Sequence, residues 1–130
     1  MDRSAVMRAV RGVNTKPELL VRRLVTALGF RYRIHRRDIP GTPDLAFMGR
    51  RKVIFVHGCF WHGHDCPRGK RIPKTNTEYW ISKIARNQER DRQIKHRLES
   101  QRWLFLEIWE CETKDEFSLS EKLRSFLSDS

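Results

Sequence analysis

The chain has 130 residues, 38% of them hydrophobic and 33% charged, so we expect a single domain spanning residues 1–130. Its net charge of +11 favours a polyanionic partner such as nucleic acid, with a merely soluble, basic surface as the alternative. The sequence lacks a bilayer-spanning apolar run and a signal-peptide apolar region, so we expect nucleic acid rather than a membrane as the partner. The odd number of cysteines (three) indicates a reducing cytoplasm, with thiols serving as ligands.

The first half of the chain predicts two helices followed by three strands. Residues 4–11 are expected to form a short helix, and Thr15 to Glu18 read as a capping box for a second helix that ends near Leu28. The apolar stripe of that second helix is formed by Leu20, Leu24 and Leu28. Strands are expected over residues 30–34, 44–48 and 53–56, the last two joined as a hairpin.

The second half predicts a long helix, a strand and a final helix. A basic loop over residues 67–75 leads to a capping box at residues 75–78 and a helix that ends near Ser100. Asp91 interrupts the apolar stripe of this helix, which otherwise consists of Ile84, Ile94 and Leu98. A strand over 103–109 and a helix capped at Ser118, with an apolar stripe, complete the chain. The element order predicts an α/β domain with a mixed sheet flanked by helices.

The sequence holds four potential metal ligands: Cys59, His64, Cys66 and Cys111. Three thiolates and an imidazole suit a closed, tetrahedral structural zinc site. Their spacing is not the common paired arrangement, and buried free cysteines beside a surface histidine are the alternative. Zinc is the preferred interpretation, because all three cysteines fall where strands end and a histidine lies among them. It would attach the loop that carries three of these residues to the edge of the last strand.

Two further histidines, His57 and His62, remain in the same stretch of sequence. A histidine of near-neutral pKa suits activation of water, and a buried carboxylate would orient it. Asp91 is the best candidate for that carboxylate, although an ion pair with an arginine is an equally good interpretation. Asp44, which follows Pro43, could bind Mg²⁺ or could simply cap a turn. Glu18 is already accounted for by the helix cap.

Large aromatic residues lie beside the basic segments. Phe60 and Trp61 are adjacent, and Tyr79 and Trp80 begin the long helix. Rings beside lysine and arginine are typical of proteins that stack on, or wedge between, nucleic-acid bases. For Trp80, packing against Ile84 one helical turn away is the better interpretation of the pattern alone.

The stretches PGTPDLAF, VIFVHGCFWHGHDCP, TEYWISKIARNQERD and WEC occur in this order and resemble the very-short-patch repair (Vsr) endonucleases. The resemblance extends from MRAV to WEC and implies a restriction-endonuclease-like core. It also implies an endonuclease that nicks duplex DNA beside a T:G mismatch, the product of 5-methylcytosine deamination. Other mismatches, deaminated purines, or binding to distorted DNA without cutting are the alternatives.

The resemblance implies a role for each candidate residue. Asp44, with the main chain of Val56, would bind Mg²⁺; His62 would be the general base, oriented by Asp91. His57 would lie near the scissile phosphate, and Glu18 would act through metal-bound water. The zinc ligands would be those named above. Phe60, Trp61 and Trp80 would intercalate, which overturns the pattern-based preference for Trp80.

The remaining expectations concern DNA and protein partners. Basic side chains would hold the DNA backbone, namely Arg8, Arg68, Lys70, Arg71 and Lys74. We expect a monomer, with mismatch-repair proteins as possible partners. The sequence departs from nuclease relatives because strand 53–56 carries no acidic residue, which leaves metal binding to lean heavily on Asp44. Any N-terminal arm before MRAV is expected to be very short.

Overall fold

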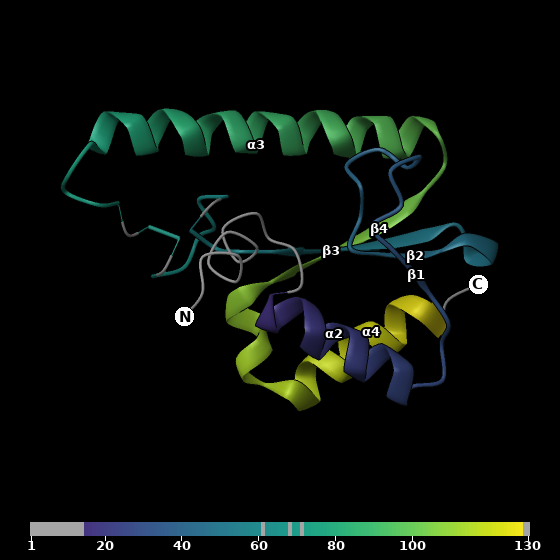
Figure 1. Cartoon of the computed structure of the whole chain (residues 1–130). Helices are drawn as coiled ribbons and strands as arrows, with labels where there is room; N and C mark the ends of the chain where they lie inside the picture. Colours follow the sequence, from purple (N-terminus) through teal and green to yellow (C-terminus); the bar gives the residue numbers. More distant parts are fainter. Residues whose placement is uncertain (1–14, 61, 68, 71, 129–130) are drawn as a thin grey trace, which may run out of the picture.

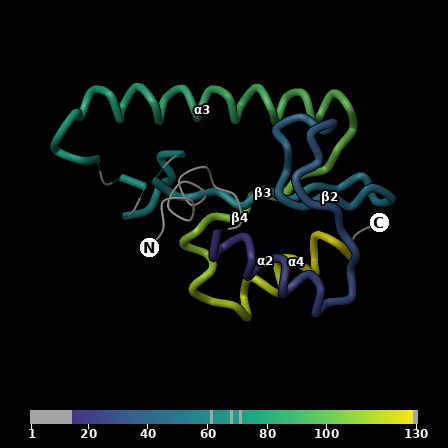
Figure 2. Tube along the Cα trace, viewed as in Figure 1, coloured from purple at the N-terminus to yellow at the C-terminus, as the bar shows by residue number. Residues whose placement is uncertain are grey.

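The computed structural model describes residues 15–60, 62–67, 69–70 and 72–128 (Figures 1 and 2). The helix predicted over residues 4–11 lies outside this part of the chain. The elements are α2 (Lys16–Ala27), β1 (Arg33–Ile34), β2 (Leu45–Phe47), β3 (Lys52–His57), α3 (Thr77–Ser100), β4 (Leu104–Trp109) and α4 (Glu116–Ser128). Short 3₁₀ helices, η1 (Met48–Arg50) and η2 (Glu110–Lys114), follow β2 and β4. Their order confirms the predicted α/β class.

The strands form one mixed sheet in the order β1-β2-β3-β4. β2 pairs antiparallel with both β1 and β3, and β4 runs parallel to β3, with His57 opposite Trp109. α3 is the crossover between the parallel strands and covers one face of the sheet, while α2 and α4 cover the other (Figure 1). Helices on both faces explain why β2 and residues 53–56 of β3 are continuous apolar runs. Among the described helices, none is both long and apolar enough to cross a bilayer.

The two faces of β3 belong to two hydrophobic clusters. Ile54 packs with Val21 and Val25 of α2 and with leucines of α4, and all of these are buried. Val53 and Phe55 face the other way and pack with Leu98 of α3. The alternation of side chains along a strand therefore fixes β3 between the two helical layers. Its last residues, Val56 and His57, emerge half-buried where the next loop begins.

The buried stripe of α2 differs from the predicted one. Glu18, Val21 and Val25 are its buried residues, whereas the predicted leucines are only partly buried and pack at the edge of the core. The strand predicted over residues 30–34 is reduced to Arg33–Ile34, both exposed, so a strand prediction based on alternation was too long.

Two helix starts also differ from the predictions. Asn76, the N-cap of α3, makes no side-chain capping bond, so the capping box expected at residues 75–78 is wrong. α4 begins at Glu116, and the Asp115 carboxylate accepts a hydrogen bond from the Ser118 N–H at 3.1 Å. The cap is therefore an aspartate three residues before the serine that the sequence suggested.

Candidate functional site

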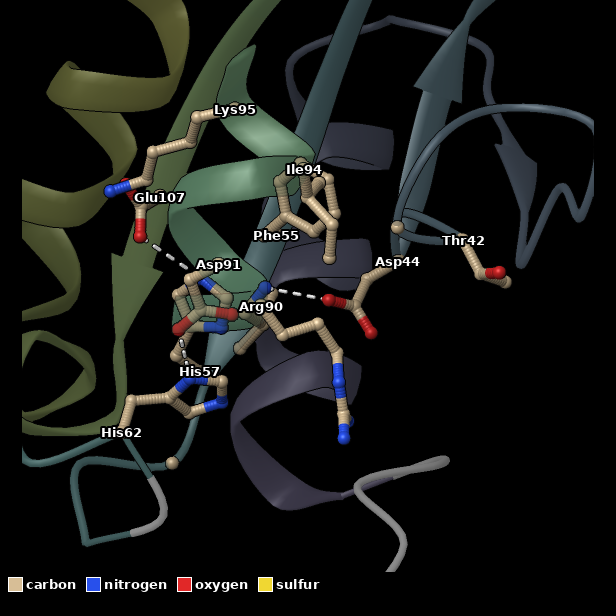
Figure 3. Close-up of a pocket in the computed structure, with 13 residues that line it drawn as sticks. Thr42, Asp44, Phe55, His57, His62, Arg90, Asp91, Ile94, Lys95 and Glu107 are labelled. Carbon is tan, nitrogen blue, oxygen red and sulfur yellow. Dashed lines mark hydrogen bonds and ion pairs between the residues drawn. The ribbon is translucent and has the colours of Figure 1, made fainter. Parts of the chain in front are cut away.

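A cavity of about 330 Å³ opens where the end of β3 meets the start of β2, the middle of α3 and β4. Figure 3 shows its side chains converging from these separate elements. Its polar lining residues are Thr42, Asp44, His57, His62, Arg90, Asp91, Lys95 and Glu107. Asp44, His57, His62 and Asp91, selected from the sequence, thus lie in one cavity.

Asp44 reaches from the start of β2 across to β3. Its Oδ2 accepts a hydrogen bond of 2.6 Å from the Val56 N–H, so its role is not merely to cap a turn. Burial, helped by the nearby Glu18 carboxylate, raises the pKa of Asp44 to about 7 against the lowering effect of this bond. Two carboxylates placed together in a buried site repel each other, and a bound cation would relieve that repulsion.

Glu18 is fully buried behind Asp44. The Thr15 hydroxyl accepts a 3.4 Å hydrogen bond from the Glu18 N–H, as a helix cap requires. The Glu18 carboxylate, however, accepts a hydrogen bond from Arg22 at 2.7 Å and makes a 2.6 Å contact with Nε2 of His35. The cap therefore does not account for this side chain.

His35 is a residue that sequence reasoning missed. One ligand atom each from Glu18, His35 and Asp44 lies within 4.8 Å of the others, so the three could hold a metal ion. In the sequence His35 stands among arginines after a weak strand, where no periodicity or spacing singled it out.

His62 and Asp91 form a direct pair at the mouth of the cavity. Nδ1 of His62 lies 2.5 Å from Oδ2 of Asp91 (Figure 3). The Gln88 amide, one turn earlier on α3, donates to the main-chain oxygen of His62 at 3.1 Å. The carboxylate that interrupts the apolar stripe of α3 thus faces a histidine, which favours the orienting role over an ion pair with an arginine.

His57 has a carboxylate partner of its own, Glu107 of β4. Nε2 of His57 lies 3.0 Å from Oε2 of Glu107, and the Lys95 ammonium lies 2.5 Å from the other carboxylate oxygen. Burial alone would raise the pKa of Glu107, but the bonds from His57 and Lys95 outweigh it and lower that pKa to about 2. The two histidine rings are adjacent, with centroids 4.3 Å apart.

Sequence reasoning missed both Glu107 and Lys95. An acidic residue inside the apolar strand LFLEIW was a visible signal. Its significance depends on the parallel register, which sets Glu107 opposite Phe55 and next to His57. The acid that β3 lacks is thus supplied to the cavity by β4, and a lysine reaches it from α3.

The four predicted metal ligands of the loop and of η2 come together. Cys59, His64, Cys66 and Cys111 each offer a ligand atom within 4.8 Å of the other three. His64 stacks on Trp109, with ring centroids 4.1 Å apart. Burial, helped by the nearby sulfurs of Cys66 and Cys111 and opposed by a backbone hydrogen bond from Cys111, raises the pKa of the Cys59 thiol to about 12. The donor set fits a tetrahedral metal site joining the loop to the end of β4.

The aromatic and basic candidates are only partly described. Phe60 and Trp80 form an edge-to-face pair with centroids 5.4 Å apart, and Trp80 is half-buried. Lys70 makes an exposed ion pair with Asp65 at 2.8 Å, and Lys74 is exposed. The other predicted DNA-contacting residues lie outside the described part of the chain: Arg8, Trp61, Arg68 and Arg71. Intercalation and backbone contacts therefore stay predictions.

Comparison with known proteins supplies a family relationship. A family model described as DNA mismatch endonuclease Vsr matches residues 1–68. The type II nicking enzyme V.XorIIP of Xanthomonas oryzae pv. oryzae is 45% identical over 98% of this chain and 93% of its own length. V.NmeAIP of Neisseria meningitidis is 42% identical over 93% and 86% of the two chains, respectively. The DNA mismatch endonuclease Vsr of Escherichia coli is 40% identical over 92% and 76%.

Proposed function

The chain belongs to the Vsr family of DNA endonucleases, and on that premise we propose that it nicks one strand of duplex DNA beside a mismatched base. We propose a T:G mismatch as the substrate and the sheet as a restriction-endonuclease-like core. One observation carries the proposal: two histidine–carboxylate pairs and the partly buried Asp44 line a single cavity. Such a set can bind a cation and move protons, as phosphodiester hydrolysis requires.

Asp44 and the main chain of Val56 are the residues proposed to hold Mg²⁺, with Glu18 behind them. When bound, this ion would neutralise charge on the phosphate and on the leaving oxygen. The proposal is supported by the bond from Val56 N–H, which fixes Oδ2 of Asp44 and leaves its Oδ1 on the side of Glu18 and His35.

Metal affinity should depend on pH, because Asp44 must lose its proton to bind a cation. With a pKa of about 7, Asp44 is protonated at pH 6 and ionised at pH 8. We expect Mg²⁺ affinity to fall about tenfold for each pH unit below 7 and to level off above it. Calorimetric Mg²⁺ titrations at pH 6, 7 and 8 would measure this. Equal affinity at pH 6 and 8 would contradict the assignment, and Asp44→Asn should bind weakly at every pH.

His62 is proposed as the base that takes a proton from the attacking water. Asp91 contacts its Nδ1 and Gln88 bonds to its main-chain oxygen, so the orientation of the ring is fixed. Its Nε2 takes no part in the contact with Asp91. A base positioned in this way contributes about 10²- to 10⁴-fold to a hydrolytic rate.

His57 is proposed to assist the leaving group. Glu107, ionised at neutral pH, would stabilise the protonated imidazole and fix its orientation. Glu107 is therefore a positioning residue, which acts through His57 and does not itself touch DNA.

Glu107→Gln tests this role. We expect kcat for nicking to fall about tenfold or more with little change in KM, since the substitution removes a charge acting in the transition state. Lys95→Met is the matched control, because it leaves the contact between Glu107 and His57 in place, and its effect should be smaller. A rise in KM at unchanged kcat in Glu107→Gln would show that Glu107 serves binding only.

Zinc is proposed to hold the loop on which His62 and Phe60 lie, through Cys59, His64, Cys66 and Cys111. Phe60, Trp61 and Trp80 are proposed to insert at the mismatch, where a poorly stacked step costs less to open. The edge-to-face contact of Phe60 with Trp80 brings two of these rings together and supports a shared wedge.

The rival function is a zinc-stapled module that binds distorted DNA without cutting it. The basic charge, the thiol cluster and the aromatic residues would suit either function, whereas the two histidine–carboxylate pairs serve only the enzyme. Incubating a labelled T:G duplex with the protein in Mg²⁺ and in EDTA separates them. We expect a nick on one strand in Mg²⁺ alone; a shifted band without a nick in both would refute the nuclease. A panel of mismatches would then test the preference for T:G.

A further inference from the structure

The metal site proposed above has a nitrogen donor beside its carboxylates. Nε2 of His35 lies 2.6 Å from Oε1 of Glu18 and 3.9 Å from Oδ1 of Asp44. Ligands that share one octahedral ion with bonds of about 2.1 Å lie about 3.0 to 4.2 Å apart. His35 therefore needs only a small shift away from Glu18 to share an ion with both carboxylates.

The backbone of His35 is held in an uncommon conformation. Its φ is +49°, in the left-handed region that residues other than glycine rarely adopt. The residue directly follows the short strand β1, and the side chain of His35 turns inward to the two carboxylates while those of Arg33 and Ile34 are exposed. Backbone strain of this kind persists where the surrounding structure holds a functional side chain in place.

The charges of the cluster suit a divalent cation that also meets a phosphate. Arg22 pairs with Glu18 at 2.7 Å and compensates one of the two carboxylates, so that Asp44, once ionised, supplies one net negative charge. A divalent ion would reverse that charge to about +1, and a phosphodiester would then neutralise it. Both carboxylates are well shielded from water, with side-chain exposures of 1% for Glu18 and 16% for Asp44.

We propose that His35 is a direct ligand of the catalytic cation, so that this site selects Mn²⁺ or a similar first-row metal over Mg²⁺. Imidazole binds first-row transition metals more strongly than Mg²⁺, which prefers oxygen ligands and retains its waters. The inference rests on the proposed function only in taking Asp44 and Glu18 as the metal site.

The test measures metal binding without DNA on the full, zinc-loaded chain. Calorimetric titrations with Mn²⁺ and with Mg²⁺ would compare the wild type with His35→Gln. We expect the variant to lose about tenfold in Mn²⁺ affinity and less than about threefold in Mg²⁺ affinity. The control is His96→Gln, which alters an exposed histidine of α3 and should change neither. Equal losses for the two metals, or none for Mn²⁺, would overturn the proposal.

A spectroscopic readout identifies the ligand directly. Electron spin echo spectra of the Mn²⁺-bound protein should show coupling to ¹⁴N that is lost in His35→Gln and kept in His96→Gln. Coupling that persists in His35→Gln would assign the nitrogen ligand to another residue. No coupling in the wild type would show that His35 bonds to Glu18 and does not bind the metal. Nicking is assayed separately: ¹⁴N coupling in a protein that does not cut T:G DNA would refute the function but not this ligand.

Discussion

Replacing His62 by alanine is expected to slow nicking of a T:G duplex by about 10²- to 10⁴-fold, with little loss of DNA binding. The side chain is half-buried at the cavity and contacts Asp91 at 2.5 Å, so its removal takes away the proposed base without touching the hydrophobic core. Single-turnover rates on a labelled duplex would measure the effect, and gel-shift titrations would measure binding. A variant that nicks as fast as the wild type would exclude His62 as the base.

Asp91→Asn separates orientation from proton transfer. It keeps a side chain of similar size but removes the charge that holds His62, so we expect a smaller loss than in His62→Ala, and no further loss when the two are combined. The matched control is Glu89→Gln on the same helix, where the carboxylate is exposed and pairs with Arg92 at 2.5 Å. Additive losses in the double variant would show that Asp91 does not act through His62.

The sequence predicted those site residues whose local pattern conflicts with ordinary packing. Asp91 could be selected because a carboxylate on an apolar helical stripe needs an explanation, and its contact with His62 supplies one. The cysteines could be selected because they fall at the ends of strands. For both sets of residues, the pattern that marks them lies within one helix or at the end of one strand. It can therefore be recognised in a single segment of the sequence.

The sequence could not predict contacts that depend on the arrangement of separate elements. Glu107 meets His57 only because β4 runs parallel to β3 in a particular register, and Lys95 joins them from the opposing helix. His35 reaches Glu18 and Asp44 only because its backbone adopts a positive φ after a two-residue strand. The predicted start of α4 was wrong for a similar reason. Asp115 and Ser118 are both good helix caps, and tertiary packing decides between them.

Removal of zinc is expected to abolish nicking although none of its four ligands lines the cavity. The four ligands are proposed to hold the loop between β3 and α3, and the described residues of this loop form no helix or strand that could hold it in their place. His62 lies only two residues before His64, so release of the ligands would free the base from Asp91. Because no described residue of this loop belongs to the two hydrophobic clusters, the far-UV circular dichroism spectrum should change little when zinc is removed.

Cys111→Ser is the sharpest variant, since Cys111 is the one ligand contributed from beyond β4 and its loss separates the loop from the sheet. We expect nicking to fall at least about 10²-fold, with a zinc content well below one ion per chain.

Because burial raises the pKa of the metal-free Cys59 thiol to about 12, zinc binding must displace protons, and its apparent affinity should rise with pH. Proton release measured during zinc titration checks that linkage. A chelated, zinc-free protein that nicks T:G DNA at the full rate would show that the loop positions His62 without the metal, and the cluster would then serve stability alone.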